Sequence, residues 1–232
     1  MRVLDISVKK KLGRLNVDIC LTVEKPMITV LFGRSGAGKT TLANMLAGLV
    51  RPDIGRIAFA DSLYDDTVRG VHMPPDKRGI GYVFQEHRLF PHLTVRENLT
   101  FGRFPGGRKS RTEFMKVVEL LRIGDLTERH TNTLSGGEAQ RVAIGRALLA
   151  CSSFLIMDEP LSSLDSGLKE EIMGYIALIP ENFCFPMIYI THSVHEVRRL
   201  ADMVALIDDG KLVSYDVPAS VFDQNGARPF AV

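Results

Sequence analysis

Apolar and polar residues alternate over two early stretches of the chain, residues 2–8 and 16–23. Because successive side chains of a strand point to opposite faces, this alternation predicts two strands, and Gly13 between them indicates an antiparallel hairpin. Residues 27–32 form an apolar run that ends at Gly33. Such a run predicts a strand with both faces buried, so we expect the N-terminal part of the chain to form a sheet.

A helical pattern follows that apolar run. It covers residues 39–49, and Gly48 followed by Pro52 indicates where the helix ends. Residues 56–60 and 79–84 have the composition of further strands. We therefore expect the first helix to follow directly on the buried strand.

The middle of the chain changes to helical character. Thr94, Ser110 and Ser135 each stand where a helix N-cap is expected, because a side-chain oxygen there can accept from a free N–H group of the first turn. A loop-like tract at residues 104–108 is too short to join two domains. This part predicts a helical subdomain inserted at about residues 86–150.

Strands and helices alternate again after the insertion. The expected strands cover residues 154–157, 187–191, 203–208 and 211–215, and the expected helices cover residues 165–179 and 193–201. Asp209-Gly210 between the last two strands is a hairpin signal. No internal repeat is present. The order of elements predicts an α/β fold in a single domain over residues 1–232.

The composition permits a packed core and limits the choice of partners. The chain has 232 residues, of which 45% are hydrophobic and 24% are charged. Its 29 basic residues nearly balance its 27 acidic ones, for a net charge of +2. This balance does not suggest a protein that binds a polyanion, so no nucleic-acid partner is expected.

Cysteine spacing and the lack of long apolar runs indicate a compartment. Cys20, Cys151 and Cys184 lack metal-ligand spacing, and we interpret them as reduced thiols. No apolar run approaches the roughly 20 residues of a membrane helix, and the N-terminus does not resemble a signal peptide. We expect a protein made and kept in the cytosol, with any role at a membrane exerted through a partner.

A phosphate-binding motif, G-x-x-x-x-G-K-[ST], stands between the expected buried strand and the first helix. Its glycines let backbone N–H groups face phosphate oxygens, and the helix N-terminus adds partial positive charge. Lys39 is expected to neutralise the β- and γ-phosphates, and the Thr40 hydroxyl to bind Mg²⁺. The predicted nucleotide-binding residues are Gly33, Arg34, Ser35, Gly36, Ala37, Gly38, Lys39, Thr40 and Thr41.

Two acidic residues, Asp158 and Glu159, end the apolar strand at residues 154–157. Carboxylates at the carboxyl end of a parallel strand lie where ligands of α/β proteins bind. We expect Asp158 to hold Mg²⁺, directly or through water, and Glu159 to act as a general base on the attacking water. The phosphate-binding motif supports this interpretation, because strand-end acids alone are often only solvated.

The segment from Leu134 to Arg141, with the letters LSGGEAQR, resembles the signature of the ATP-binding cassette (ABC) ATPases. Ser135, Gly136 and Gly137 would expose free N–H groups at a helix start, which is an anion site. In this family the anion is the γ-phosphate held by the other subunit. The resemblance therefore implies a homodimer assembled head to tail around two ATP molecules.

Other positions of that family are present in the same order. Gln85 resembles the Q-loop glutamine, which contacts Mg²⁺ and the attacking water. Ser162 to Asp165 resembles the D-loop, which crosses the dimer interface, and His192 resembles the switch histidine, which contacts the γ-phosphate. The resemblance runs from residue 1 to about residue 220. It implies a P-loop NTPase core of ABC type with an N-terminal antiparallel β subdomain and an inserted α-helical subdomain.

One feature of the family is missing. An aromatic residue of the N-terminal hairpin usually stacks on adenine, but residues 1–31 contain no Phe, Tyr or Trp. The base has to be held in another way, and Leu12 and Arg14 are the candidates. No residue is assigned that role.

The stretch over residues 75–99 resembles importer ATPases, and most of all the molybdate importer ATPase. Importers of sulfate, iron or polyamines share much of it and stay as alternatives. In importers an apolar notch here receives a helix of the membrane permease, so Leu89, Phe90 and His92 are expected to dock one. Core packing is the other interpretation of Leu89 and Phe90. The implied protein is peripheral at the cytoplasmic face of the membrane and reaches a periplasmic or extracellular substrate-binding protein only indirectly.

Three further alternatives stay open at this point. Many molybdate and sugar importer ATPases carry a regulatory β-domain after the catalytic domain. The sequence ends at Val232, which leaves no room for that domain, so a short form or a truncated chain is expected. A soluble ABC ATPase that acts on nucleic acid or ribosomes would usually have two cassettes or a coiled-coil insertion. A nucleotide sensor without turnover would be expected to lack Glu159 or an intact signature.

Overall fold

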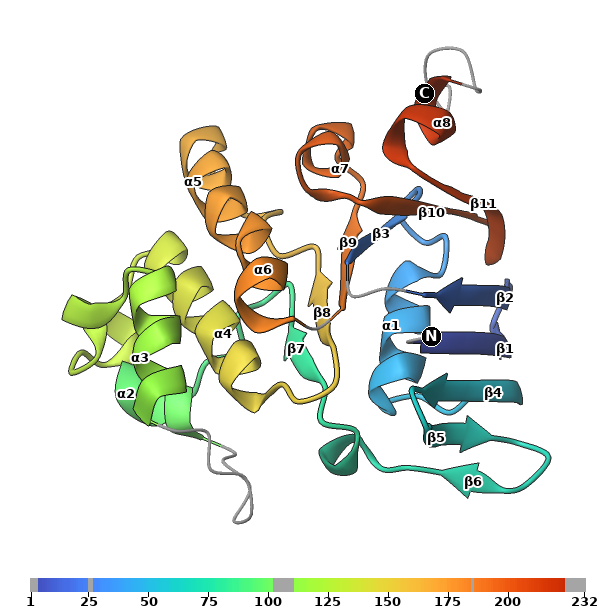
Figure 1. Ribbon diagram of the computed structural model, residues 1–232, viewed down its shortest axis with the longest axis horizontal. Helices are drawn as coiled ribbons and strands as arrows, with labels where there is room; N and C mark the ends of the chain where they lie inside the picture. The colour runs from blue at the N-terminus through green and yellow to red at the C-terminus, as the bar shows by residue number, and fades with distance from the viewer. Residues whose placement is uncertain (1–3, 25–26, 102–110, 185, 224–232) are drawn as a thin grey trace.

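The computed structural model describes residues 4–24, 27–101, 111–184 and 186–223. The described strands form one 11-stranded sheet in the order β6-β5-β4-β1-β2-β11-β10-β3-β9-β8-β7 (Figure 1). The strands are β1 Leu4–Leu12, β2 Leu15–Val23, β3 Ile28–Phe32, β4 Ile54–Phe59, β5 Ser62–Asp66, β6 Val71–His72, β7 Gly81–Val83, β8 Leu155–Asp158, β9 Met187–Thr191, β10 Met203–Asp208 and β11 Lys211–Asp216. The helices are α1 Lys39–Ala47, α2 Val95–Thr100, α3 Arg111–Leu120, α4 Gly136–Ala150, α5 Ser166–Ala177, α6 Ile179–Phe183, α7 Val194–Leu200 and α8 Pro218–Asp223.

The antiparallel part of the sheet begins with the predicted hairpin. β1 and β2 pair antiparallel, with Leu12 opposite Leu15, and β4 pairs with the other edge of β1. β5 and β6 extend this part and were not expected from the sequence. Asp65 and Asp66 explain the miss, because acidic residues are depleted in strands and only tertiary contacts hold them here.

The parallel part of the sheet contains β10, β3, β9, β8 and β7. All five residues of β3 are buried, as the apolar run predicted. Val30 and Phe32 pack into one core cluster and Leu31 into another, so the strand supports both faces of the sheet. The glycine-rich loop connects the end of β3 to the start of α1. The predicted α/β fold is confirmed.

The turn between β10 and β11 braces that loop. Asp209 and Gly210 have φ values of 43° and 76°, as a tight hairpin turn requires. The Gly210 N–H donates to the Ala37 carbonyl at 3.0 Å, and the Asp18 N–H donates to the Gly210 carbonyl at 2.8 Å. A Cβ at Gly210 would lie 2.2 Å from the Asn16 carbonyl oxygen. The hairpin therefore ties β2 to the glycine-rich loop.

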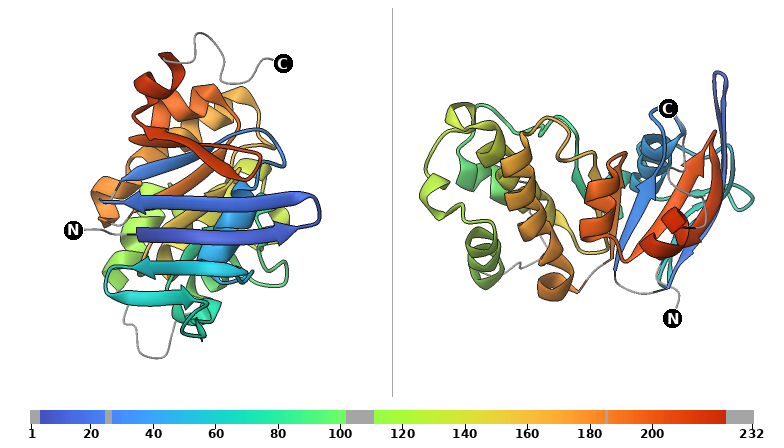
Figure 2. Two further views of the ribbon diagram at one scale, coloured as in Figure 1. Left: turned by 90° about the vertical axis from the view of Figure 1, so that its right-hand side faces the viewer. Right: turned by 90° about the horizontal axis from the view of Figure 1, so that it is seen from above.

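Helices α2, α3 and α4 gather at the end of the molecule opposite the antiparallel strands (Figure 2). Thr94 and Ser135 are confirmed as N-caps, and each forms a capping box with the glutamate three residues later. The tract at residues 104–108 and the expected cap Ser110 lie outside the described residues. The short α6 was not predicted, because Pro180 in its first turn is a residue typical of loops.

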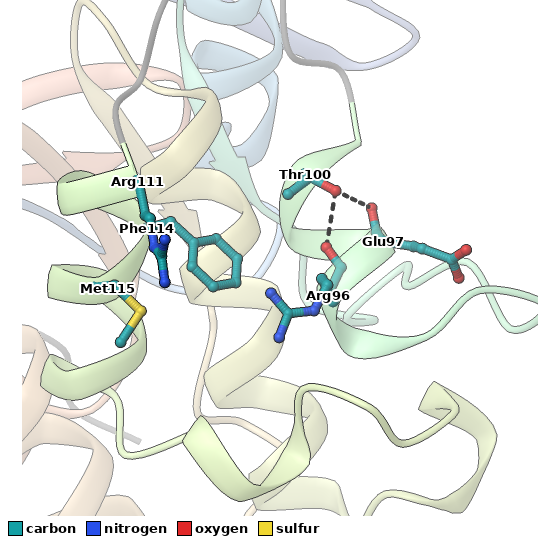
Figure 3. A pocket seen from close by; sticks show the side chains of 6 residues that line it. All are labelled: Arg96, Glu97, Thr100, Arg111, Phe114 and Met115. Atoms are coloured by element: carbon teal, nitrogen blue, oxygen red, sulfur yellow. Dashed lines mark hydrogen bonds between the residues drawn. The ribbon is translucent and has the colours of Figure 1, made fainter.

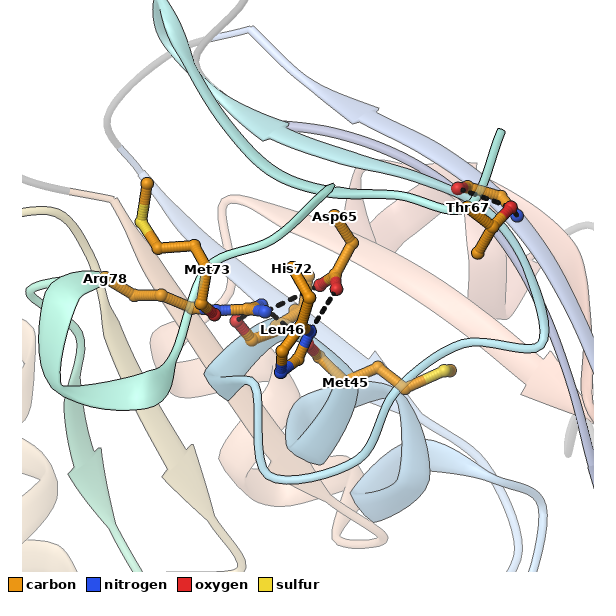
Figure 4. Close-up of polar contacts among 8 residues, drawn as sticks. Met45, Leu46, Asp65, Thr67, His72, Met73 and Arg78 are labelled. Carbon is orange, nitrogen blue, oxygen red and sulfur yellow. Dashed lines mark hydrogen bonds and ion pairs between the residues drawn. The ribbon is translucent and has the colours of Figure 1, made fainter. Parts of the chain in front are cut away.

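A buried arginine joins α1 to the antiparallel strands (Figure 4). Arg78 is 1% exposed, and its Nη1 donates to the carbonyls of Met45 and Leu46 at the end of α1. Its Nη2 donates to Oδ2 of Asp65 at 2.7 Å, and the other oxygen of Asp65 lies 2.6 Å from Nδ1 of His72. Arg78 thus satisfies carbonyl groups that a helix end leaves without partners.

Candidate nucleotide-binding site

The glycine-rich loop, the end of β8 and the segment after β7 enclose a hollow of about 290 Å³. Its lining residues are Leu15, Ser35, Gly36, Gly38, Lys39, Thr40, Thr41, Gln85 and Glu159. Eight of these nine residues, all except Leu15, are ones that the sequence assigned to nucleotide binding or catalysis. The fold therefore brings the motif, Gln85 and Glu159 to one place.

Glycines make the loop possible. Gly36 and Gly38 have φ values of 80° and 101°, in the left-handed region where other residues are strained. A Cβ at Gly33 would lie 2.1 Å from the main-chain oxygen of Ile207. Only a residue without a side chain fits at Gly33, so the loop packs directly on β10.

Lys39 is the first residue of α1, directly after the glycine-rich loop, and is only 4% exposed. Its Nζ donates to the carbonyl oxygens of Gly33 at 2.8 Å and Arg34 at 2.7 Å. Burial lowers the pKa of Lys39, and the negative charges of Glu159 and Asp158 oppose that shift. A phosphate is a stronger acceptor than these carbonyls, so the site favours an anion beside Lys39.

Thr40 and Asp158 form the oxygen-rich side of the site. The Thr40 hydroxyl donates to Oδ1 of Asp158 at 3.1 Å. Burial raises the pKa of Asp158, while hydrogen bonds from Thr40 and Tyr82 oppose that shift. Hydroxyl and carboxylate oxygens are ligands that Mg²⁺ prefers, so this pair fits the ion. No group of three or more His, Cys, Asp or Glu residues suited to a metal occurs among the described residues.

Glu159 and His192 meet at the carboxyl ends of β8 and β9. Nδ1 of His192 lies 3.3 Å from Oε2 of Glu159. Glu159 has a φ of 44°, which is strained for a residue with a side chain, and such strain is typical of functional sites. Its N–H donates to the Ile190 carbonyl at 3.0 Å, and its own carbonyl accepts from the Ser162 side chain. The carboxylate is thus held at the hollow.

The signature residues lie elsewhere on the chain. Ser135, Gly136 and Gly137 do not line the hollow, and Ser135 and Gly136 are exposed at the start of α4. A Cβ at Gly137 would lie 2.5 Å from the Leu168 side chain, so this glycine allows α4 to pack on α5. Asp165 caps α5, since its carboxylate accepts from the Leu168 N–H at 3.0 Å. None of these residues lines the hollow at this chain's own glycine-rich loop.

Three residues of the site were not expected from the sequence. The Tyr82 hydroxyl lies 3.3 Å from both Oδ2 of Asp158 and Oδ1 of Asn44, and burial is the main cause that raises the pKa of Tyr82. Leu15 lines the hollow, whereas the suggested Leu12 and Arg14 do not appear in its lining. Tyr82 could have been placed near Asp158 only from the pairing of β7 with β8, and the sequence does not show which strands are neighbours.

A second hollow, of about 540 Å³, lies between α2 and α3 (Figure 3). It is lined by Arg96, Glu97, Thr100, Arg111, Phe114 and Met115. The Arg96 guanidinium lies 5.5 Å from the centre of the Phe114 ring and pairs with Glu128. Glu97 is engaged in the cap of α2. Arg96 and Glu97 thus take part in packing and helix capping, and we assign no catalytic role to this hollow.

Comparisons with known proteins agree with this geometry. The family model for "ABC transporter" matches residues 17–162. The chain is 48% identical over 227 residues to the molybdenum import ATP-binding protein ModC of Paramagnetospirillum magneticum, which covers 97% of this chain but 62% of that protein. The chain therefore spans less than two thirds of the length of this relative.

Solved structures share the fold. CbiO1 from Clostridium perfringens, part of the ABC transporter complex CbiONQ, superposes with a TM-score of 0.82 at 26% identity, covering 97% of this chain and 92% of that one. A dimeric ATP-binding cassette in a post-hydrolysis state, bound to ADP and Pi, has a TM-score of 0.76 at 25% identity, covering 93% and 98%.

Proposed function

This chain belongs to the ABC transporter family, and from that premise we propose that it binds and hydrolyses MgATP to energise an importer of a small oxyanion, molybdate. One observation carries the proposal. Lys39, Thr40 and Glu159 line one hollow beside a glycine-rich loop, with Asp158 bonded to Thr40 and His192 next to Glu159. This set supplies a phosphate cradle, oxygen ligands and a carboxylate next to an imidazole, which are the parts that phosphoryl transfer to water needs.

The proposed chemistry divides the work among these residues. Residues 33–41 hold the phosphates through backbone N–H groups, and Lys39 exchanges its carbonyl partners for β- and γ-phosphate oxygens. Thr40, Asp158 and Gln85 would hold Mg²⁺, which when bound would neutralise negative charge on the phosphates. Glu159 orients the attacking water and accepts its proton. His192, which lies beside Glu159, contacts the γ-phosphate.

We propose that the active unit is a homodimer arranged head to tail. Ser135 and Gly136 are exposed, Gly137 is buried beside them, and none of the three lines the hollow at the glycine-rich loop of their own chain. The N–H groups of an exposed helix start can bind a phosphate, so this end of α4 can complete the site of a second copy. Asp165 and Ser162, which precede α5, would then cross the dimer interface. The dimeric cassette with ADP and Pi supports this arrangement by similarity.

We propose that the membrane partner docks near the segment that follows Gln85. Leu89 packs partly against the core, whereas Phe90 is half-buried and contacts Phe101, with ring centres 4.1 Å apart and the ring planes tilted by 42°. Phe101 is itself 53% exposed, so the pair presents an apolar surface beside the nucleotide site. No helix in the described part of the chain is long and apolar enough to cross a bilayer. A permease with its own membrane helices would supply that path, and the chain would lie at the cytoplasmic face.

The name of the relative from P. magneticum supports molybdate over sulfate, iron or polyamines. The test is transport. The chain is co-expressed with a candidate molybdate permease and its substrate-binding protein and reconstituted in vesicles. ATP-dependent uptake of molybdate, in excess over sulfate, is expected. ATP hydrolysis that no oxyanion stimulates in the reconstituted complex would contradict the importer assignment.

A further inference from the structure

Arg146 of α4 reaches the segment that follows Gln85. Its Nη1 donates to the main-chain oxygen of Arg88 at 2.8 Å, and its Nη2 donates to the main-chain oxygen of His87 at 3.2 Å. The guanidinium carbon lies 5.3 Å from the centre of the Phe90 ring. One side chain of α4 therefore contacts this segment at three points.

This arrangement is unusual for a cation. Burial lowers the pKa of the Arg146 guanidinium, and no carboxylate pairs with it in the described part of the chain. A half-buried cation without a counter-charge costs free energy unless other groups satisfy it. The carbonyl groups and the aromatic face provide that compensation here. A lysine would match it less well, because its donors share one nitrogen, whereas the planar guanidinium presents separate nitrogens to the two carbonyls and a flat face to the ring.

The held segment has strained backbone. Arg88 has a φ of 49°, in the left-handed region, and its guanidinium lies 4.1 Å from the centre of the Phe84 ring. The Phe84 ring stacks in turn on Tyr82, with centres 4.2 Å apart. A non-glycine residue stays in this conformation only where its surroundings hold it. The bond from Arg146 to the Arg88 carbonyl is one such restraint.

We propose that Arg146 is a positioning residue that fixes residues 86–90 to α4 and so sets the place of Gln85 in the nucleotide pocket. α4 starts at the exposed signature residues Ser135 and Gly136 and carries Arg146 further along. A shift of the signature helix is then passed to Gln85 through hydrogen bonds to the main chain. The link to hydrolysis rests on the proposed function, whereas the anchor is a property of the folded chain.

Three variants test the anchor in the nucleotide-free protein. Arg146→Gln removes the fork, and Arg146→Lys keeps the charge and one hydrogen bond. Lys116→Gln is the matched control, because Lys116 also donates to a carbonyl, that of Asn182, and lies 5.0 Å from the Phe183 ring centre. Amide hydrogen exchange over residues 86–90 is expected to rise by about tenfold in Arg146→Gln, less in Arg146→Lys and not in Lys116→Gln. Exchange that stays unchanged in both Arg146 variants would overturn the anchor.

A second measurement tests positioning. The chain contains no tryptophan, so Glu86→Trp places a single fluorescent reporter beside Gln85. In that background, Arg146→Gln is expected to remove most of the fluorescence response to MgATP. It should lower kcat by about ten- to a hundredfold, as small misplacements of a catalytic group do, while nucleotide affinity changes by less than about threefold.

The outcomes separate the two hypotheses. Faster exchange with an unchanged kcat and an unchanged fluorescence response would overturn the positioning role and leave the proposed function intact. If the parent protein hydrolyses no ATP, the proposed function fails, and hydrogen exchange still decides whether Arg146 anchors the segment. Should Arg146→Gln fail to fold, Arg146→Lys gives the same comparison with an intermediate effect.

Discussion

Nδ1 of His192 lies 3.3 Å from Oε2 of Glu159, although the two residues follow different strands. β8 and β9 run parallel with Asp158 opposite Ile190, so the residues just beyond their ends are neighbours. The Glu159 N–H bond to the Ile190 carbonyl holds this arrangement. Hydrolysis in the proposed mechanism depends on this pair at the carboxyl ends of β8 and β9.

Glu159→Gln should keep nucleotide binding and lose most turnover. The amide has nearly the same shape but cannot accept a proton, and a general base typically contributes about 10²- to 10⁴-fold. Phosphate release measures the loss, and gel filtration with MgATP should show a trapped dimer. Glu119→Gln on α3 is the control, with wild-type turnover expected. Near-normal hydrolysis by Glu159→Gln would refute the assignment of the base.

Ser135→Arg should spare nucleotide binding by the single chain and block hydrolysis, since Ser135 is proposed to act on the partner's nucleotide. Mixing it with a Lys39→Ala chain gives a heterodimer in which one site has both Lys39 and Ser135 intact. Partial recovery of ATPase activity is expected. Heterodimers that form, as shown by tagged co-purification, and yet hydrolyse no more ATP than either parent would count against the head-to-tail arrangement.

Phe90→Asp should abolish assembly with the permease, because it places a charge on the apolar surface that Phe90 and Phe101 share. The isolated variant should fold and bind ATP, as circular dichroism and nucleotide titration would show. His92→Ala at the exposed neighbouring position should have a smaller effect. A folded Phe90→Asp protein that still assembles and responds to substrate would exclude this docking surface, and an unfolded one would favour core packing.

Arg78→Leu should lower the free energy of unfolding by about 3–5 kcal/mol, the usual effect of leaving one member of a buried ion pair without its partner. Asp65 would lose its guanidinium, and the carbonyls at the end of α1 would lose their donors. Denaturant titration measures this. The double variant Arg78→Leu with Asp65→Leu should recover part of the loss, because no buried carboxylate is then left without its guanidinium. Equal stability of Arg78→Leu and wild type would show that the cluster is not coupled to folding.

Some features of the candidate site are local and could be predicted. The proposed phosphate-binding loop is one continuous stretch, and the motif needs its glycines, lysine and threonine at set spacings whatever surrounds them. Helix caps are also local, and Thr94, Ser135 and Asp165 all act as caps through residues three positions away. Apolar runs predicted the buried strands because their pattern depends only on which faces are covered.

The sequence by itself thus determined the α/β fold, the phosphate loop and the acids at the end of β8. Only the tertiary structure decided that Tyr82 and Asn44 meet at Asp158, and that Arg78 and Arg146 bind carbonyls on distant segments. Periodicity and motif spacing indicate whether a residue lies in a strand or a helix, but not which other elements that residue contacts. Contacts between elements depend on which strands are neighbours in the sheet and on how far a long side chain reaches, and packing of the whole core sets both.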